Sequence, residues 1–95
     1  MPVVVASQTW QLSMPGCTSL KEKRSVVRSL KDRLRARFQL SVAETAYQDV
    51  HARAEIAVAM VTSDRRLAEQ VLDKADHLVR ESGRALILDT HRDFH

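Results

Sequence analysis

The sequence predicts one α+β domain, residues 1–95, in which two helices cover one face of a four-stranded antiparallel sheet. Three observations support this prediction. Segments with strand and helix periodicity follow one another as strand, helix, strand, strand, helix, strand. No linker, repeat or low-complexity tract divides the chain. A chain of 95 residues is long enough for a single modest core. The order is that of the ferredoxin-like arrangement, βαββαβ.

A first strand is expected at residues 3–14, where apolar and polar side chains alternate with one break at Gln8. A Pro-Gly pair ends this strand. Ser19 and Glu22, three residues apart, form a capping box, so a helix is expected to begin after Ser19. The apolar positions on one side of that helix are Leu20, Val27, Leu30, Leu34 and Phe38.

Two further strands are expected at residues 40–47 and 53–62, joined by a polar turn and paired as a hairpin. The second of them is largely apolar on both faces, which is typical of a strand that is covered on both sides. Two interpretations remain open. Either the outer face of the sheet packs against a second copy of the chain, or it is partly solvated and needs no partner.

A second helix is expected after Ser63 or Asp64, either of which can cap it, and Gly83 suits its C-terminal stop. Its apolar positions, three or four residues apart, are Leu67, Val71, Ala75 and Leu78. Residues 84–90 form the last expected strand, and the remaining tail is expected to fray.

Positive charge is concentrated in the first helix. Eight of the chain's fifteen Lys and Arg lie in residues 20–38 beside only two acidic residues, which gives this segment a net charge of +6. The rest of the chain carries −3. Such asymmetry indicates an anionic partner such as nucleic acid or lipid. Lipid is the weaker interpretation, because the apolar face that would enter a membrane is the one expected to face the core.

Five of these cations form a stripe on one flank of the helix, spaced three and four residues apart. The basic stripe comprises Lys21, Arg24, Arg28, Lys31 and Arg35. Arg33 and Arg37 are expected on the opposite flank, and Lys23 is expected to extend outward from near the core side. The stripe is about 21 Å long, which matches several successive phosphates of a nucleic-acid backbone. The alternative is an ordinary solvated helix face.

The sequence contains no recognisable catalytic constellation. Two glycines are too few for a glycine-rich phosphate loop, and the central strands lack the aromatic residues with which an RNA recognition motif stacks bases. His51 beside Asp49 could act as an oriented base, but a self-bonded polar turn is the simpler interpretation. No catalytic, cofactor or metal site is therefore expected.

Two other residue types that often carry chemistry receive the same interpretation. His91 and His95 have the spacing of two metal ligands on a helix, but no third ligand is apparent. Cys17 precedes a helix without a visible base partner, so it is expected to be an ordinary loop cysteine. A lone cysteine, no long apolar run and no signal-peptide pattern predict a cytosolic protein without membrane contact.

Several short motifs along the chain resemble those of the YlxP-like family, a bacterial family of unknown function. They are Pro15-Gly16, Ser19-Leu20-Lys21-Glu22-Lys23-Arg24, Leu30-Lys31, Arg33-Leu34, Arg37-Phe38, Ser41-Val42-Ala43-Glu44, Gln48-Asp49 and Arg53-Ala54. The resemblance implies a ferredoxin-like fold in a cytosolic bacterial protein. It also implies a link to translation or ribosome assembly, because family genes often lie near those for a translation initiation factor and ribosome-binding factor A. No catalytic residues are established for the family, so none is carried over.

The sequence therefore predicts a non-enzymatic accessory protein that binds structured RNA or a ribosomal particle through the basic stripe, with Arg33 and Arg37 assisting. The alternative is a homodimeric protein-interaction module that uses the outer sheet face and binds no nucleic acid. No cofactor is expected in either case.

Overall fold

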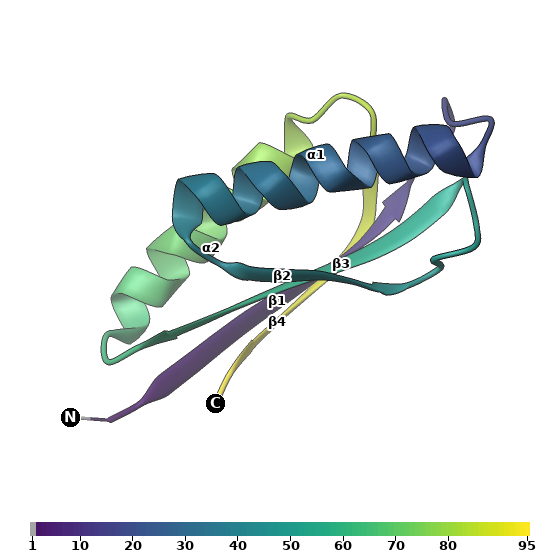
Figure 1. Ribbon diagram of the computed structural model, residues 1–95. Helices are drawn as coiled ribbons and strands as arrows, with labels where there is room; N and C mark the ends of the chain where they lie inside the picture. Colours follow the sequence, from purple (N-terminus) through teal and green to yellow (C-terminus); the bar gives the residue numbers. More distant parts are fainter. Residues whose placement is uncertain (1) are drawn as a thin grey trace.

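The computed structural model describes residues 2–95 and contains the six elements in the predicted order (Figure 1). They are β1 (Val4–Ser13), α1 (Leu20–Phe38), β2 (Ser41–Ala46), β3 (Arg53–Thr62), α2 (Arg65–Arg80) and β4 (Leu86–Phe94). In the part of the chain that the structure describes, no helix is long and apolar enough to cross a membrane.

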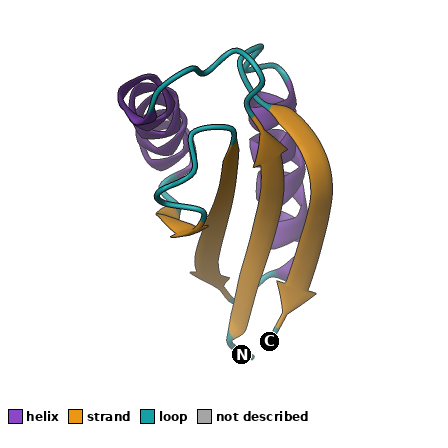
Figure 2. Cartoon of the chain, turned by 90° about the vertical axis from the view of Figure 1, so that its right-hand side faces the viewer, coloured by secondary structure: helices purple, strands orange, loops and turns teal. Residues whose placement is uncertain are grey.

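The four strands form one sheet in the order β2-β3-β1-β4, and every neighbouring pair is antiparallel. The central pair is fully in register from Val4 opposite Thr62 to Ser13 opposite Arg53. Both helices lie on the same side of this sheet (Figure 1), and the two ends of the chain lie close together at one end of it (Figure 2). The predicted ferredoxin-like fold is confirmed.

The core lies between the sheet and the two helices. The inward-facing residues of β1, among them Trp10 and Leu12, are fully buried, as are Ala54 and Ile56 of β3. Burial of such apolar side chains stabilises the fold by about 1.5–3 kcal/mol for each large one. The sheet therefore presents one apolar face to the helices.

The predicted core face of α2 is partly wrong. Leu67 is 45 % exposed and Val71 is only half-buried, whereas Ala68 and Leu72 are fully buried. The buried residues of α2 are Ala68, Leu72, Ala75, Leu78 and Val79. The apolar stripe of this helix is wider than the area that the sheet covers, so the packing of α2 on β1 and β3 decided which side of the stripe is buried.

The last strand extends beyond its predicted end. It continues to Phe94, and His95 exchanges backbone hydrogen bonds with Val5, with its N–H at 2.8 Å from the Val5 carbonyl. The expectation of a frayed tail is wrong, because β1 is long enough to pair with these residues. A bulge opposite Gln11 and Leu12 shifts the register within this pair.

Candidate nucleic-acid interface

The basic helix begins after Ser19, as the sequence predicts. The Ser19 hydroxyl accepts a hydrogen bond from the Glu22 N–H at 3.1 Å, and the Glu22 carboxylate accepts one from the Thr18 N–H at 3.2 Å. At the other end, Gln39 adopts a left-handed conformation with φ 54°, and its N–H donates to the Arg35 carbonyl. These caps hold nineteen residues in one helix.

Lys23 is fully buried, which corrects the expectation that it extends outward. Its ammonium group lies 2.6 Å from the Glu44 carboxylate and donates to the Tyr47 carbonyl. Burying a charge without a partner is very costly, but here an opposite charge and a carbonyl surround it. Lys23 therefore fastens α1 to β2 and is not available to a ligand.

Four of the five stripe residues are free of ion pairs. Lys21, Arg24 and Arg28 are exposed and Lys31 is half-buried, and none of them lies within 4.0 Å of a carboxylate among residues 2–95. The row that they form covers about 15 Å of helix at 1.5 Å per residue. Unpaired like charges at this spacing repel one another by a few tenths of a kcal/mol per pair. The arrangement leaves a field that an anion can neutralise.

The fifth stripe residue, Arg35, is engaged within the fold. Its guanidinium donates to the Val42 carbonyl of β2 at 2.9 Å and lies 3.8 Å from Asp32. This contact shows that the stripe runs along the flank of α1 that faces β2. Half of the Arg35 side chain remains exposed, so it borders the free row while it anchors the helix.

Arg33 and Arg37 lie on the other flank, which faces α2. Arg33 lines a small hollow with Arg84, while Arg37 lines a larger groove to which α2 contributes Lys74. Lys74 and Arg84 were not predicted for this surface, because neither belongs to a basic cluster in the sequence. Only the placement of α2 beside α1 brings them to this flank.

Cations elsewhere are more often neutralised than those of α1. Of the seven outside this helix, four lie within 4.0 Å of a carboxylate. These pairs are Arg65 with Glu69 at 3.6 Å, Arg80 with Asp76 at 2.7 Å, Arg84 with Glu22 at 3.9 Å and Arg92 with Asp73 at 2.9 Å. On α1, in contrast, six of eight cations have no such partner among residues 2–95.

A polar network anchored on Asp76 explains why Gln8 interrupts the alternation of apolar and polar residues in β1. The Asp76 carboxylate accepts hydrogen bonds from the Trp10 indole at 2.9 Å and the Gln8 amide at 3.3 Å, and Arg92 donates to the Gln8 oxygen. Burial by itself raises the pKa of Asp76. Hydrogen bonds from Trp10 and Arg80 and the charges of Arg80 and Arg92 outweigh burial and hold that pKa below its ordinary value. This network secures α2 on the sheet.

The side chains weighed for catalysis form no hydrogen bond with one another among residues 2–95. The His51 Nδ1–H donates to the Cys17 carbonyl at 2.9 Å, and no hydrogen bond joins His51 to Asp49 within residues 2–95. Cys17 is buried in the core. These contacts brace the two loops at one end of the sheet.

The two C-terminal histidines also serve no common site. They lie four residues apart on an extended segment, about 13 Å at 3.3 Å per residue, too far to share one metal ion. Within the described residues there is no cluster of three or more His, Cys, Asp or Glu side chains that could hold a metal.

The fold and this surface define a small ferredoxin-like α+β protein with an unneutralised basic helix. Comparison of the sequence with family models matches residues 5–92 to the family described as "Protein of unknown function (DUF503)". The chain belongs to this family, and the resemblance inferred from its motifs is confirmed. A similar relative is the uncharacterized protein YlxP of Bacillus subtilis (strain 168), 38 % identical over 56 residues. That match covers 59 % of this chain and 61 % of the relative's length.

Solved structures resemble this chain in fold alone. The structure of Rv0793 from Mycobacterium tuberculosis has a TM-score of 0.61 at 13 % identity, with 99 % of this chain and 93 % of that chain covered. The de novo designed protein LFR1 1, described as having a ferredoxin fold, has a TM-score of 0.50 at 12 % identity, with 100 % and 86 % covered.

Proposed function

We propose that this protein is a non-enzymatic accessory protein that binds structured RNA, free or within a ribosomal particle, through the basic stripe of α1, with Arg33 and Arg37 on the other flank assisting. The observation that carries the proposal is the row Lys21, Arg24, Arg28 and Lys31, exposed or half-buried and without a carboxylate partner among residues 2–95. Phosphates are the ligands that such a row suits, because each contact releases counterions and needs no sequence readout.

The rigidity of α1 supports the same proposal. Lys23 and Arg35 attach this helix to β2 near its two ends, so the free cations are presented on a fixed element. A row of about 15 Å held in one orientation can follow a phosphate backbone at little entropic cost. The family that the motifs resemble often has its genes near translation genes, which agrees with RNA as the anionic ligand. In this proposal the protein acts in the bacterial cytosol.

The test is co-sedimentation with small ribosomal subunits and with free ribosomal RNA across a salt series. Four phosphate contacts predict a log-log slope of about −3 to −4. A variant with Arg24→Gln and Arg28→Gln should reduce the slope by about 2, because two contacts are lost. A matched variant with Arg65→Gln and Arg66→Gln removes the same charge from α2 and should bind like the wild type. Salt-independent binding, or equal loss in both variants, would contradict the proposal.

A second candidate function is a homodimeric interaction module. The outer sheet face carries a shallow hollow of about 380 Å³ over small side chains, among them Ser7, Ala43, Ala57 and Ala59. Small residues let a second sheet approach closely. Measurement of the molecular mass in solution, with the protein at tens of micromolar, distinguishes a monomer from a dimer. A strict monomer would remove this candidate, and Ala57→Arg should dissociate a dimer if one forms.

A further inference from the structure

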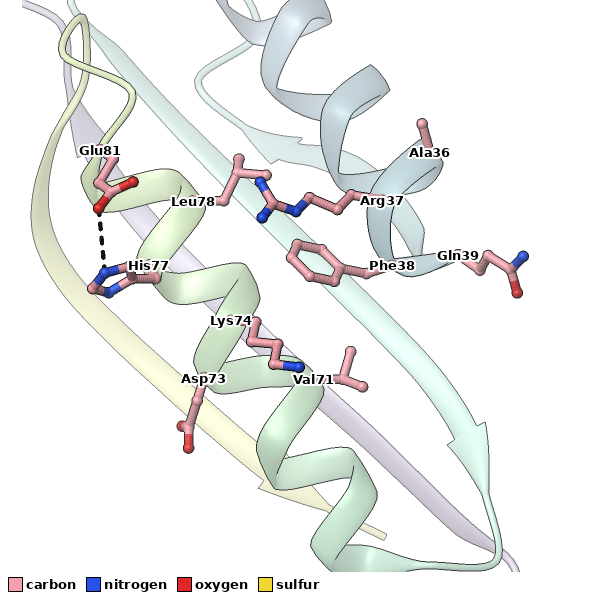
Figure 3. Close-up of a pocket in the computed structure, with 10 residues that line it drawn as sticks. All are labelled: Ala36, Arg37, Phe38, Gln39, Val71, Asp73, Lys74, His77, Leu78 and Glu81. Carbon is pink, nitrogen blue, oxygen red and sulfur yellow. Dashed lines mark ion pairs between the residues drawn. The ribbon is translucent and has the colours of Figure 1, made fainter.

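The two helices are separated by a groove at the C-terminal end of α1. It has a volume of about 830 Å³, within the range typical of small-molecule sites. Phe38 of α1 and Val71 and Leu78 of α2 line it. Figure 3 shows the Phe38 ring extending from the end of α1 toward α2, with the Arg37 guanidinium beside it and the Lys74 side chain below it. The groove therefore combines a half-buried aromatic ring, which also packs against the core, with cations from both helices.

The groove contains two cations that no carboxylate of the described residues neutralises. Of its two carboxylates, Asp73 lies 2.9 Å from Arg92, and Glu81 lies 3.2 Å from His77, a contact that is an ion pair only when the imidazole is protonated. Figure 3 shows Asp73, His77 and Glu81 directed away from α1. Arg37 and Lys74 have no carboxylate partner among residues 2–95, and both are exposed. Two free cations thus flank a half-buried aromatic ring.

We infer that this groove receives an unpaired nucleotide of the RNA bound along α1. The base stacks on Phe38, and its phosphates contact Arg37 and Lys74. Stacking on an aromatic side chain is the usual way in which proteins hold a single-stranded base, and Arg beside the ring adds a cation–π contribution. The Arg37 guanidinium already lies 5.7 Å from the centre of the Phe38 ring. Unlike the sheet of an RNA recognition motif, the aromatic platform here is at the end of a helix.

The groove can accept an unpaired nucleotide but not a base that is paired within a duplex. A paired base is stacked inside its helix and cannot present its face to Phe38, whereas the free cations of α1 contact phosphates of either form. The inference rests on the proposed function and narrows its ligand to RNA with unpaired nucleotides next to a structured region. It predicts that a preference for unpaired bases and the salt-dependent affinity reside in different residues.

The test compares a blunt RNA duplex with the same duplex carrying a short run of unpaired adenosines, by fluorescence anisotropy. The wild type should bind the second RNA about tenfold more tightly, as expected for one stacked base. Phe38→Leu keeps an apolar side chain and should remove this preference without changing affinity for the blunt duplex. Phe38→Trp should retain it, and its indole fluorescence should be quenched only by the RNA with unpaired bases. Lys74→Gln should lower the salt slope for that RNA by about 1, whereas Arg66→Gln should not.

The outcomes separate the inference from the function on which it rests. Equal affinity of the wild type for both RNAs, with binding that still depends on Arg24 and Arg28, would overturn the inference and leave the proposed function in place. A preference that persists in Phe38→Leu would also overturn it. If the wild type binds neither RNA at low salt, both fail. The Phe38→Trp variant keeps the test decisive if Phe38→Leu is unfolded.

Discussion

The Lys23 ammonium lies 2.6 Å from the Glu44 carboxylate, and this buried ion pair joins the first turns of α1 to β2. Lys23 also donates to the carbonyl of Tyr47, whose φ of 63° is left-handed and uncommon for an aromatic residue. One side chain thus fixes the helix, the edge strand and the start of the following turn. Two motifs that support the family resemblance, around Lys23 and around Glu44, meet in this contact.

Breaking this pair should be costly. Lys23→Met should lower the free energy of unfolding by about 3–5 kcal/mol, because it leaves Glu44 as a mostly buried charge without its partner. The double variant Lys23→Met and Glu44→Leu should recover most of the loss, because an apolar pair of similar volume avoids the desolvation penalty. Urea unfolding of the three proteins measures the difference. A single variant as stable as the wild type would show that the pair is not formed.

Arg35 and Arg28 should behave differently although both belong to the basic stripe. Arg35→Gln removes the hydrogen bond to the Val42 carbonyl and should cost about 1 kcal/mol of stability. Arg28→Gln has no such bond to lose and should leave stability within about 0.5 kcal/mol, while it lowers the salt slope of RNA binding by about 1. Thermal unfolding and the salt series on both variants check this. The reverse pattern would assign Arg35 to the ligand and Arg28 to the fold.

Asp76 should make the protein sensitive to acid. Its pKa is lowered in the folded state, so ionised Asp76 contributes stability above its unfolded pKa, near 3.8, and that contribution is lost as the pH falls through the folded value. Asp76→Asn should therefore be less stable than the wild type at pH 7, with a gap that narrows below about pH 4. Unfolding curves of both proteins at pH 7 and below about pH 4 measure this difference in stability. A constant gap would show that the charge of Asp76 does not contribute.

Gly83 lies just after the C-terminal end of α2, where the chain is left-handed. It has a φ of 76°, and a Cβ there would meet nothing within 4 Å, so the cost of Gly83→Ala is backbone strain alone, about 1 kcal/mol. Gly16→Ala is the matched control, because that site is equally open and its φ is not positive. Chemical denaturation of both variants should show a loss only for Gly83→Ala. Equal stability would mean that the chain relaxes out of the left-handed conformation.

Much of the fold could be predicted because its signals are local. The bounds of α1 follow from a capping box and a continuous helical period, and those of β3 from a run of residues that favour strands. The position of Gly83 after α2 follows from the needs of a left-handed turn. Each of these signals involves residues close together in the chain, so the sequence by itself determined the order of elements and the concentration of charge on one helix.

The tertiary structure decided which of those side chains remain available. Lys23 is buried because Glu44, twenty-one positions later, comes to lie beneath α1, and Arg35 is engaged because β2 passes beside it. Val71 lies at the edge of the core and lines a groove, and Lys74 joins Arg37 there, because α2 packs at a distance from the end of α1. The same physical reason applies to each of these side chains. Burial and pairing depend on which elements meet in space, and the periodicity of a single helix carries no information about its neighbours.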